Sequence, residues 1–349
     1  MARIDRLPEG AKSVLQIGAV IGREFGWELL KEVSGLTEQE LTTHVAELTN
    51  AELIYERGLP PRITYLFKHV FTQEAAYRSL LTSRRRVFHH RVALTLETLF
   101  PDRLEEYYGQ LAHHFREAVQ EDEMDKAIDY AIRAGNRNMA LLVYAEAVRF
   151  YQMALHALEG QKTVDEDQRC TVLLALGEAQ RKAGEPLQAL ETLQRAANSA
   201  RLLRSSEHLA RAALESEWTT WTSTLPSAES VLCLLQEALQ ELGEVDSALR
   251  AKTLGSMSRA VLFIGAQEQA MEYARQAVEV ARRVGDPEVL AFTLGCTLYA
   301  PWRPDETEEK LACATEMVQL AEVVGDSEIV IEAHSRRLVA CSNWEISRP

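Results

Sequence analysis

The sequence predicts an almost entirely helical protein, in which a short N-terminal part with one β-hairpin precedes a right-handed α-solenoid. From about residue 105 onward, apolar residues recur at i, i+3, i+4 and i+7, the spacing of amphipathic helices. Gly, Pro or Asp interrupts this pattern about every 15 to 20 residues, which is typical of successive helical hairpins. Strand-like runs are confined to about residues 52 to 68.

The N-terminal part shows three short helical patterns, at residues 11–22, 26–35 and 37–53. The third begins at Thr37, followed three residues later by Glu40, which is the sequence pattern of a capping box. Strand-like runs at 53–58 and 63–69 flank the turn "LPPR" and predict a hairpin. Three helices followed by a two-stranded wing are winged-helix architecture, which we expect over residues 1–82.

Linking helices are expected over residues 83–122, and the first of them should end near Pro101. The repeat part follows over residues 123–349, as about five helical hairpins of which the last is incomplete.

Small residues recur at one spacing in the second helix of successive hairpins. The first triplet is Ala147, Tyr151 and Ala154, and equivalent triplets are Ala189, Leu193, Ala196 and Ala270, Ala274, Ala277. Twelve residues before each triplet stand Gly135, Gly177 and Ser258, and Gly295 begins a further copy with Leu311 and Ala314. This pattern resembles the tetratricopeptide repeat, in which small residues let two helix backbones approach closely.

A weaker copy centres on Trp218 and Thr219, so the repeat intervals are 42, 42, 39 and 37 residues. These intervals exceed the usual length of about 34 residues and predict helices lengthened by about one turn.

Composition restricts the class of protein. The longest weakly polar stretch, residues 14–22, is far shorter than the roughly 20 apolar residues that cross a bilayer, and the N-terminal residues do not read as a signal peptide. We therefore expect no membrane contact and a cytoplasmic location, and both ends read as truncated. Five widely spaced cysteines without a CxxC pair read as reduced thiols.

The net charge of −14 is uneven, because residues 1–100 carry 13 Lys+Arg against 12 Asp+Glu. The repeat part is therefore strongly acidic, which disfavours nonspecific binding of nucleic acid.

Motifs for catalysis are missing. The sequence has no GxxxxGK[ST] phosphate loop, no HExxH and no GxSxG. The pairs His89-His90 and His113-His114 are neighbours on helices, and such neighbours point about 100° apart, so each pair is poorly placed to chelate one ion. We predict a chain that is not an enzyme, with no cofactor and no metal.

The segment "ARIDRLPEGAKSVLQIGAVIGREF" and the segment "YLFKHVFTQEAAYRSLLTSRRRVFHHRVA" together resemble the winged-helix part of STAND-class signalling ATPases. The similarity covers residues 2 to about 100 and is strongest to proteins that join a class III adenylate/guanylate cyclase domain to an ATPase and a tetratricopeptide tail. It implies an ATPase module upstream of the sequence and a winged helix that closes over the bound nucleotide.

The same resemblance implies a nucleotide-phosphate sensor at His69, at the end of the last wing strand. The residues beside it, Lys68 and Val70, depart from the Met and Asp of the MHD motif. The alternative is that His69 caps the following helix or fills a polar gap in the wing.

Arg84, Arg85 and Arg86 wrap around one helix and cannot all be buried, so we expect one or two of them to pair with acidic residues of the repeat tail. A winged helix with a basic segment also suits DNA, but the presumed recognition helix carries four glutamates between residues 38 and 52 and no Lys or Arg. We therefore do not expect DNA binding.

The concave surface of the solenoid is the usual partner face, and the repeat register assigns side chains to it. The predicted groove residues are Asn136, Glu178, Thr220, Arg259 and Phe292. Their mixed polar and apolar character suits a protein segment or a small effector.

The predicted function is a non-catalytic regulatory or sensor fragment that binds a partner on its repeats and restrains an ATPase or cyclase module. The alternatives are a freestanding tetratricopeptide scaffold for protein interactions and a fragment of a transcription regulator.

Overall fold

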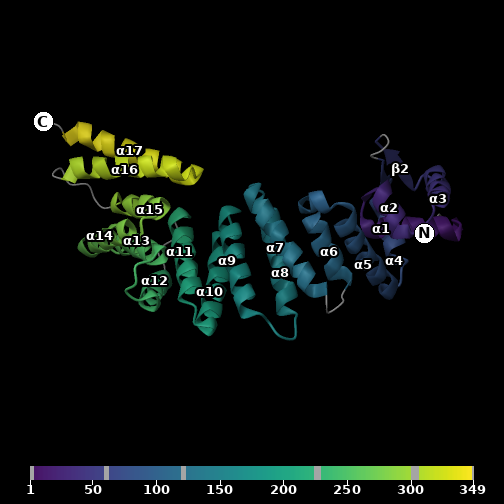
Figure 1. The fold of residues 1–349 in the computed structure, drawn as a ribbon, viewed down its shortest axis with the longest axis horizontal. Helices are drawn as coiled ribbons and strands as arrows, with labels where there is room; N and C mark the ends of the chain where they lie inside the picture. Colours follow the sequence, from purple (N-terminus) through teal and green to yellow (C-terminus); the bar gives the residue numbers. More distant parts are fainter. Residues whose placement is uncertain (1–3, 59–62, 119–122, 224–228, 300–305, 348–349) are drawn as a thin grey trace. The chain divides into compact units, whose positions relative to one another are not determined.

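The computed structural model describes residues 4–58, 63–118, 123–223, 229–299 and 306–347, and Figure 1 labels its elements. The chain divides into two compact units, Met1–Lys162 and Thr163–Pro349. Each unit is described by itself, and the domain limits expected from the sequence stay a prediction.

The first unit begins with three helices and a small antiparallel sheet. The elements are η1 (Ile4–Arg6), α1 (Glu9–Ile21), β1 (Glu24–Gly26), α2 (Trp27–Ser34), α3 (Glu38–Asn50), β2 (Ile54–Arg57) and β3 (Thr64–Phe67). The sheet order is β1-β3-β2, so β3 is central. The three predicted helices and both hairpin strands are therefore confirmed, whereas the predicted turn at 59–62 lies outside the described residues. Thr37 and Glu40 form the predicted capping box at the start of α3.

Strand β1 corrects the expectation that strands are confined to residues 52–68. It pairs with β3 and places Phe25 opposite Tyr65. The Phe25 ring is buried against the Tyr65 and Phe67 rings, with centroids 6.0 and 5.7 Å apart. Gly18 of α1 lies against the same ring, since a Cβ there would stand 2.8 Å from it. A strand of three residues is too short to show an alternating pattern in the sequence. The packing of Phe25 against the two rings of β3 holds this strand in the sheet.

The first unit continues as a series of helices. These are α4 (Val70–Arg78), α5 (Thr82–Leu99), η2 (Pro101–Tyr107), α6 (Tyr108–Ala118), α7 (Met124–Ala140) and α8 (Tyr144–Glu159). Helix α1 packs against α2, α3, α4 and α5, and contacts then run in order from α5 through α6 and α7 to α8. Helix α5 ends just before Pro101, as predicted.

The second unit consists of helical hairpins. Its described elements are α9 (Glu166–Lys182), α10 (Pro186–Leu203), α11 (Ser206–Thr222), α12 (Glu229–Leu242), α13 (Ala248–Phe263), α14 (Gln267–Val284), α15 (Pro287–Thr297), α16 (Thr307–Val324) and α17 (Ser327–Ser347). Each odd-numbered helix from α9 to α15 packs against the helix that follows it, and also against the next odd-numbered helix. This is the predicted tetratricopeptide-like α-solenoid, with an inner layer formed by α9, α11, α13, α15 and α17.

Close helix crossings occur where the repeat register places small residues. A Cβ on Gly177 would lie 2.7 Å from Leu193, and one on Gly135 of the first unit would lie 2.5 Å from Tyr151. Ala196 and Ala277 are completely buried. The two glycines are thus required because a large side chain of the following helix packs directly against them, at the positions that the repeat register predicts.

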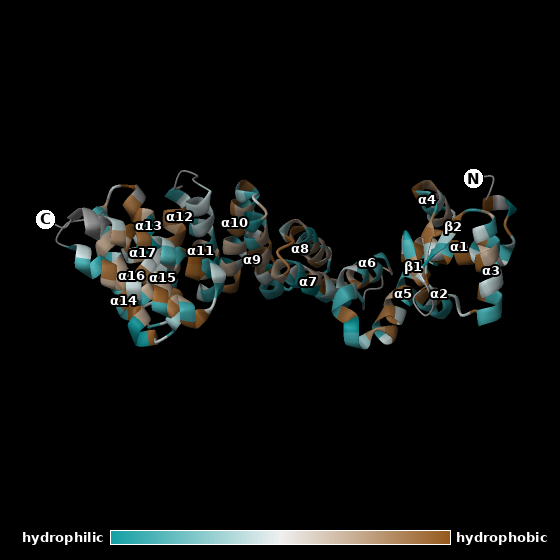
Figure 2. Ribbon diagram, turned by 90° about the horizontal axis from the view of Figure 1, so that it is seen from above, coloured by the Kyte–Doolittle hydropathy of each residue, from teal (hydrophilic) through white to brown (hydrophobic). Residues whose placement is uncertain are grey.

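In Figure 2, hydrophobic and hydrophilic residues are interspersed along the helices of each unit, as expected where a helix buries one face and exposes the other. Within the described ranges, none of the helices combines the length and apolar character that crossing a membrane requires.

Candidate functional site

A groove lies along the inner layer of the second unit and has a volume of about 570 Å³. Its apolar lining residues are Leu174, Ala175, Leu214, Trp218, Leu249, Phe292, Met317 and Ile329. Its charged lining residues are Glu178, Arg181, Lys182, Arg211, Glu215, Lys252, Arg259, Glu288, Asp326, Glu328 and Glu332. All five inner helices contribute, so the groove is a product of the repeat stacking.

Capping side chains fix where the inner helices begin. Each cap accepts hydrogen bonds from the backbone N–H groups of the first turn, and the caps are Asp165, Ser205, Ser247, Asp286 and Asp326. A cap of this kind typically contributes about 1 kcal/mol to helix stability. The caps therefore set the register in which the five helices face the groove.

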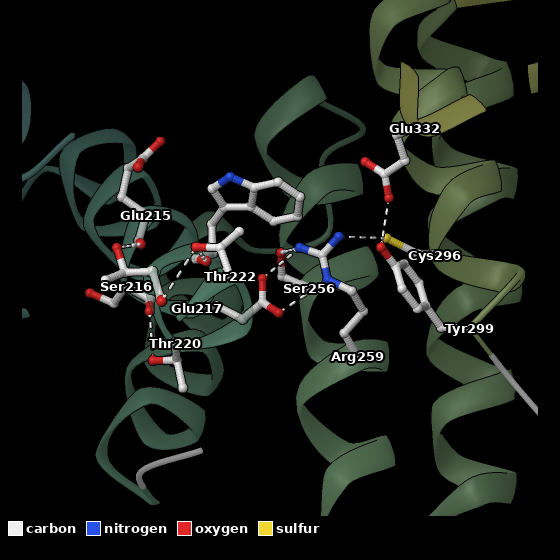
Figure 3. A network of polar contacts seen from close by, with 12 residues as sticks. Glu215, Ser216, Glu217, Thr220, Thr222, Ser256, Arg259, Cys296, Tyr299 and Glu332 are labelled. Atoms are coloured by element: carbon white, nitrogen blue, oxygen red, sulfur yellow. Dashed lines mark hydrogen bonds and ion pairs between the residues drawn. The ribbon is translucent and has the colours of Figure 1, made fainter. Parts of the chain in front are cut away.

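A buried ion pair supports the wall of the groove. Arg259 of α13 donates from Nε and Nη2 to the two carboxylate oxygens of Glu217 on α11, over 3.1 and 2.5 Å. Its Nη2 also donates to the Ser256 hydroxyl, and its Nη1 contacts the Cys296 sulfur at 3.5 Å. Figure 3 shows Arg259 between Glu217 and Cys296. Only 2% of Arg259 and 4% of Glu217 are exposed, so water contributes little to their solvation.

Aromatic rings surround the Arg259 guanidinium. Its central carbon lies 4.9 Å from the ring centroid of Phe292 and 5.1 Å from that of Trp218, within the range of cation–π attraction. Burial alone would lower the pKa of Arg259, but the Glu217 carboxylate outweighs it and the pKa is raised. The guanidinium is therefore a permanent cation that holds three inner helices together.

Charged side chains at the groove are largely paired with each other. Lys252 contacts Glu288 at 2.7 Å, and Lys182 contacts Glu178 at 3.1 Å. These pairs are half exposed, so each contributes little to stability.

The structure brings three of the five predicted groove residues together. Glu178, Arg259 and Phe292 line the groove. Thr220 is buried and donates to the backbone carbonyl of Ser216 within α11.

The fifth predicted residue, Asn136, belongs to the first unit, where its Oδ1 accepts a hydrogen bond from the Tyr151 hydroxyl. Sequence reasoning missed Arg181, Lys252 and Glu288 of the groove. Helical spacing could have found them, because residues three, four or seven apart lie on the same helix face. Arg181 follows Glu178 by three residues, Glu288 precedes Phe292 by four, and Lys252 precedes Arg259 by seven.

His69 is exposed at the N-cap position of α4, and its side chain makes none of the described capping hydrogen bonds. The nearby Phe71 is 82% exposed. The role assigned to His69 stays a prediction.

The arginine triplet differs from expectation. Arg84 lies over the Phe88 ring and Arg85 over the Tyr77 ring, with centroid distances of 5.6 and 5.1 Å. Arg85 also donates to the Thr82 hydroxyl at 3.2 Å. None of the ion pairs found among the described residues involves the triplet.

Three histidines of the first unit meet where α5 crosses α6. The Nδ1 atoms of His89 and His114 lie 2.8 Å apart, and the His113 ring is 5.4 Å from that of His89. On the other side of His89, its Nε2 lies 3.0 Å from the Tyr77 hydroxyl. Neighbouring histidines on one helix point in different directions, which was the reason to expect no shared ion. The fold adds His89 of α5 to His113 and His114 of α6, so three rings from two helices meet.

Burial lowers the pKa of His89 to about 4, and the neighbouring His113 adds to this shift. Burial also lowers the pKa of His113 and, more strongly, that of His114. All three imidazoles are therefore uncharged at neutral pH.

Neither family models nor curated proteins match the chain. Solved structures with a similar course of helices include a STAND protein with a tetratricopeptide repeat sensor from Pyrococcus horikoshii, at 13% identity and a TM-score of 0.43. The match covers 99% of this chain and 54% of that one, so this chain spans about half its length.

Two further similar structures are an aspartyl phosphate phosphatase from Bacillus subtilis and a Rap protein in complex with competence and sporulation factor. The first has 10% identity and a TM-score of 0.48, covering 91% of this chain and 84% of that chain. The second has 11% identity and a TM-score of 0.47, covering 95% and 88%. These likenesses concern the helical architecture alone.

Proposed function

We propose that the chain is a non-catalytic regulatory fragment whose second unit binds a segment of a partner protein in the inner groove. The groove itself is the observation that carries this proposal. Its volume of about 570 Å³ accommodates several side chains of a bound segment. Its lining combines apolar and charged side chains, as protein-binding surfaces do.

Two aromatic side chains are the proposed anchor points. Trp218 and Phe292 are partly exposed in the groove and rest against the Arg259 guanidinium. Because the buried ion pair holds these rings in place, a partner need not order them on binding, which favours affinity. A peptide with apolar side chains at intervals matching the groove is the expected ligand.

The test begins with a selection from a random peptide library on the tag-free chain. Selected peptides are then titrated against the wild type, Ala175→Arg and Ala312→Arg. Ala175 lines the groove, whereas Ala312 is exposed on α16, outside the groove lining, and provides a matched control.

We expect Ala175→Arg to weaken binding at least about tenfold, equivalent to about 1.4 kcal/mol, and Ala312→Arg to leave it unchanged. A selection without binders, or peptides that bind both variants equally, would refute the groove as the site.

The finer proposal concerns the first unit. Its three helices and antiparallel sheet support a winged helix, as the sequence resemblance to cyclase-linked STAND ATPases implies. In this proposal the unit packs on an upstream ATPase module, and His69 contacts the nucleotide phosphate there. The exposure of His69 and Phe71 supports a surface that another module covers.

A protein that also carries the ATPase module tests this part. His69→Ala should change ADP affinity or basal output there while shifting the stability of the present chain by no more than about 0.5 kcal/mol, as for other exposed side chains. Loss of folding in the present chain, with unchanged ADP affinity in the longer protein, would assign His69 to the wing itself. A freestanding scaffold shares the groove but has no nucleotide response, so the same experiment separates the two functions.

A further inference from the structure

The convergence of His89, His113 and His114 is independent of the groove. One ring nitrogen from each histidine lies within 4.8 Å of one from each of the others. Two of the rings are buried to 1% exposure, and His113 is the most open of the three. Three imidazoles at this separation are unusual for a core that only needs filling, because each ring requires polar partners.

We propose that these three histidines bind one divalent first-row transition ion, with Zn²⁺ as the best fit. Imidazole nitrogen suits zinc, copper, nickel and iron, whereas calcium and magnesium prefer oxygen ligands. Three protein ligands leave one position of a tetrahedral zinc ion for water.

The required movements are small. Zinc–nitrogen bonds of about 2.0–2.1 Å in a tetrahedral arrangement place ligand nitrogens about 3.3–3.4 Å apart. The Nδ1 atoms of His89 and His114, now 2.8 Å apart, must separate by about half an ångström, and the remaining nitrogen must move closer. Rotation of the His113 ring, the most open of the three, would bring its nitrogen closer.

Tyr77 supplies the outer support that ligating histidines usually have. Its hydroxyl lies 3.0 Å from Nε2 of His89, so it can accept a hydrogen bond from the Nε2–H group and leave the Nδ1 lone pair facing the other rings. The contact orients the His89 ring, and this tautomer is the one that a metal needs.

Charged side chains near the three histidines and a hollow that reaches them affect how a cation would bind. Glu117 favours positive charge on His89, whereas Arg85 and Arg116 oppose it, and Arg116 is itself paired with Glu117 at 2.9 Å. A hollow of about 390 Å³ reaches His113 and His114, and its lining carries Glu105 and Glu106 together with Arg137 and Arg149. The charges along this route are balanced, so the hollow provides access for an ion rather than electrostatic attraction.

The test uses the full chain without a histidine tag, stripped with a chelator and then titrated with Zn²⁺ by calorimetry. We expect one ion per chain. A visible absorption band on adding Co²⁺ should report tetrahedral nitrogen coordination, and excess Zn²⁺ should raise the midpoint of thermal unfolding because only the folded chain joins the three ligands.

Three variants make the test specific. His113→Ala removes the most open ligand and should weaken binding at least about a hundredfold, while Tyr77→Phe should weaken it by about 10- to 100-fold. The matched control is His90→Ala, since His90 is the next residue on α5 but pairs with Glu123 instead. Circular dichroism confirms that each variant folds.

Retention of binding by His90→Ala together with its loss in His113→Ala supports the site. Absence of stoichiometric binding to the wild type, or equal weakening by His90→Ala and His113→Ala, would overturn it.

Discussion

Removal of Glu217 is the sharpest test of how the groove is supported. The substitution Glu217→Ala leaves the Arg259 guanidinium in place, 2% exposed, without its bidentate carboxylate partner. Ser256 and Cys296 remain as neighbours, but neither side chain supplies the charge that balances the guanidinium. The chain must therefore either keep an unpaired buried cation or open α11 away from α13.

The magnitude follows from this burial. Breaking a buried ion pair by removing one partner typically costs about 3–5 kcal/mol. The rings of Trp218 and Phe292 contact the cation before and after the substitution, so they do not change this difference. We expect a loss of about 3–5 kcal/mol in the free energy of unfolding, which for a unit of this size lowers the melting temperature by roughly 6–20 °C.

The assay is urea unfolding followed by circular dichroism, with tryptophan fluorescence as a second signal because Trp218 adjoins the pair. The matched control is Glu272→Ala. Glu272 also receives hydrogen bonds from an arginine, Arg275, through Nε and Nη2, but both side chains are about half exposed and Arg275 has a second partner in Glu279. Such surface pairs are worth about 0–1 kcal/mol. The two substitutions therefore each break an Arg–Glu pair, one that is buried and one that is exposed.

A double replacement, Glu217→Leu with Arg259→Met, removes both charges and is the complementary test. Apolar residues of similar volume often replace a buried ion pair at little cost. We expect the double variant to be more stable than Glu217→Ala. Equal stability of Glu217→Ala and Glu272→Ala would refute the claim that the pair is buried and isolated from water.

Three further predictions follow from packing, thiol chemistry and missing motifs. Ala196→Leu and Ala277→Leu should each destabilise the chain by about 1–3 kcal/mol, because the larger side chain overpacks a buried helix crossing. Glu279→Ala, at an exposed position, should leave the thermal melt unchanged. Equal effects of the three substitutions would contradict the repeat register. Burial raises the pKa of the Cys296 thiol to about 12, so at pH 8 a disulfide reagent should label the exposed Cys233 quickly and Cys296 only in denaturant. Purified chain should hydrolyse ATP no faster than buffer, since the sequence lacks a phosphate loop, and hydrolysis abolished by a substitution in this chain would contradict the reading.

The repeat part could be predicted from the sequence because its signals are local. The spacing of Ala189, Leu193 and Ala196 reports a helix crossing, and the same spacing recurs in other hairpins. The capping box at Thr37 is likewise contained within four residues. Strand β1 could not be predicted, because its position depends on Phe25 packing against residues 40 positions later in the chain.

The candidate sites were predictable only in part, for the same reason. The register placed Arg259 on an inner helix, but its partner Glu217 lies 42 residues away on another. Helical geometry likewise separated His113 from His114 on one helix, and only the fold adds His89 between α5 and α6. Residue type and spacing therefore predict which face a side chain occupies, whereas the partner across the interface follows from how the helices stack.

The distribution of charge in the groove bears on what kind of partner it suits. Although the repeat part is strongly acidic, Lys252 and Lys182 already contact carboxylates, so an acidic partner would have to displace one ion pair to form another. Such an exchange between half-exposed charges yields little free energy. The rings of Trp218 and Phe292, in contrast, offer apolar surface that the buried guanidinium holds in place, and burying it releases water at little cost in side-chain entropy. The groove is therefore suited to recognise shape and apolar pattern, while its paired charges exclude partners that cannot satisfy them.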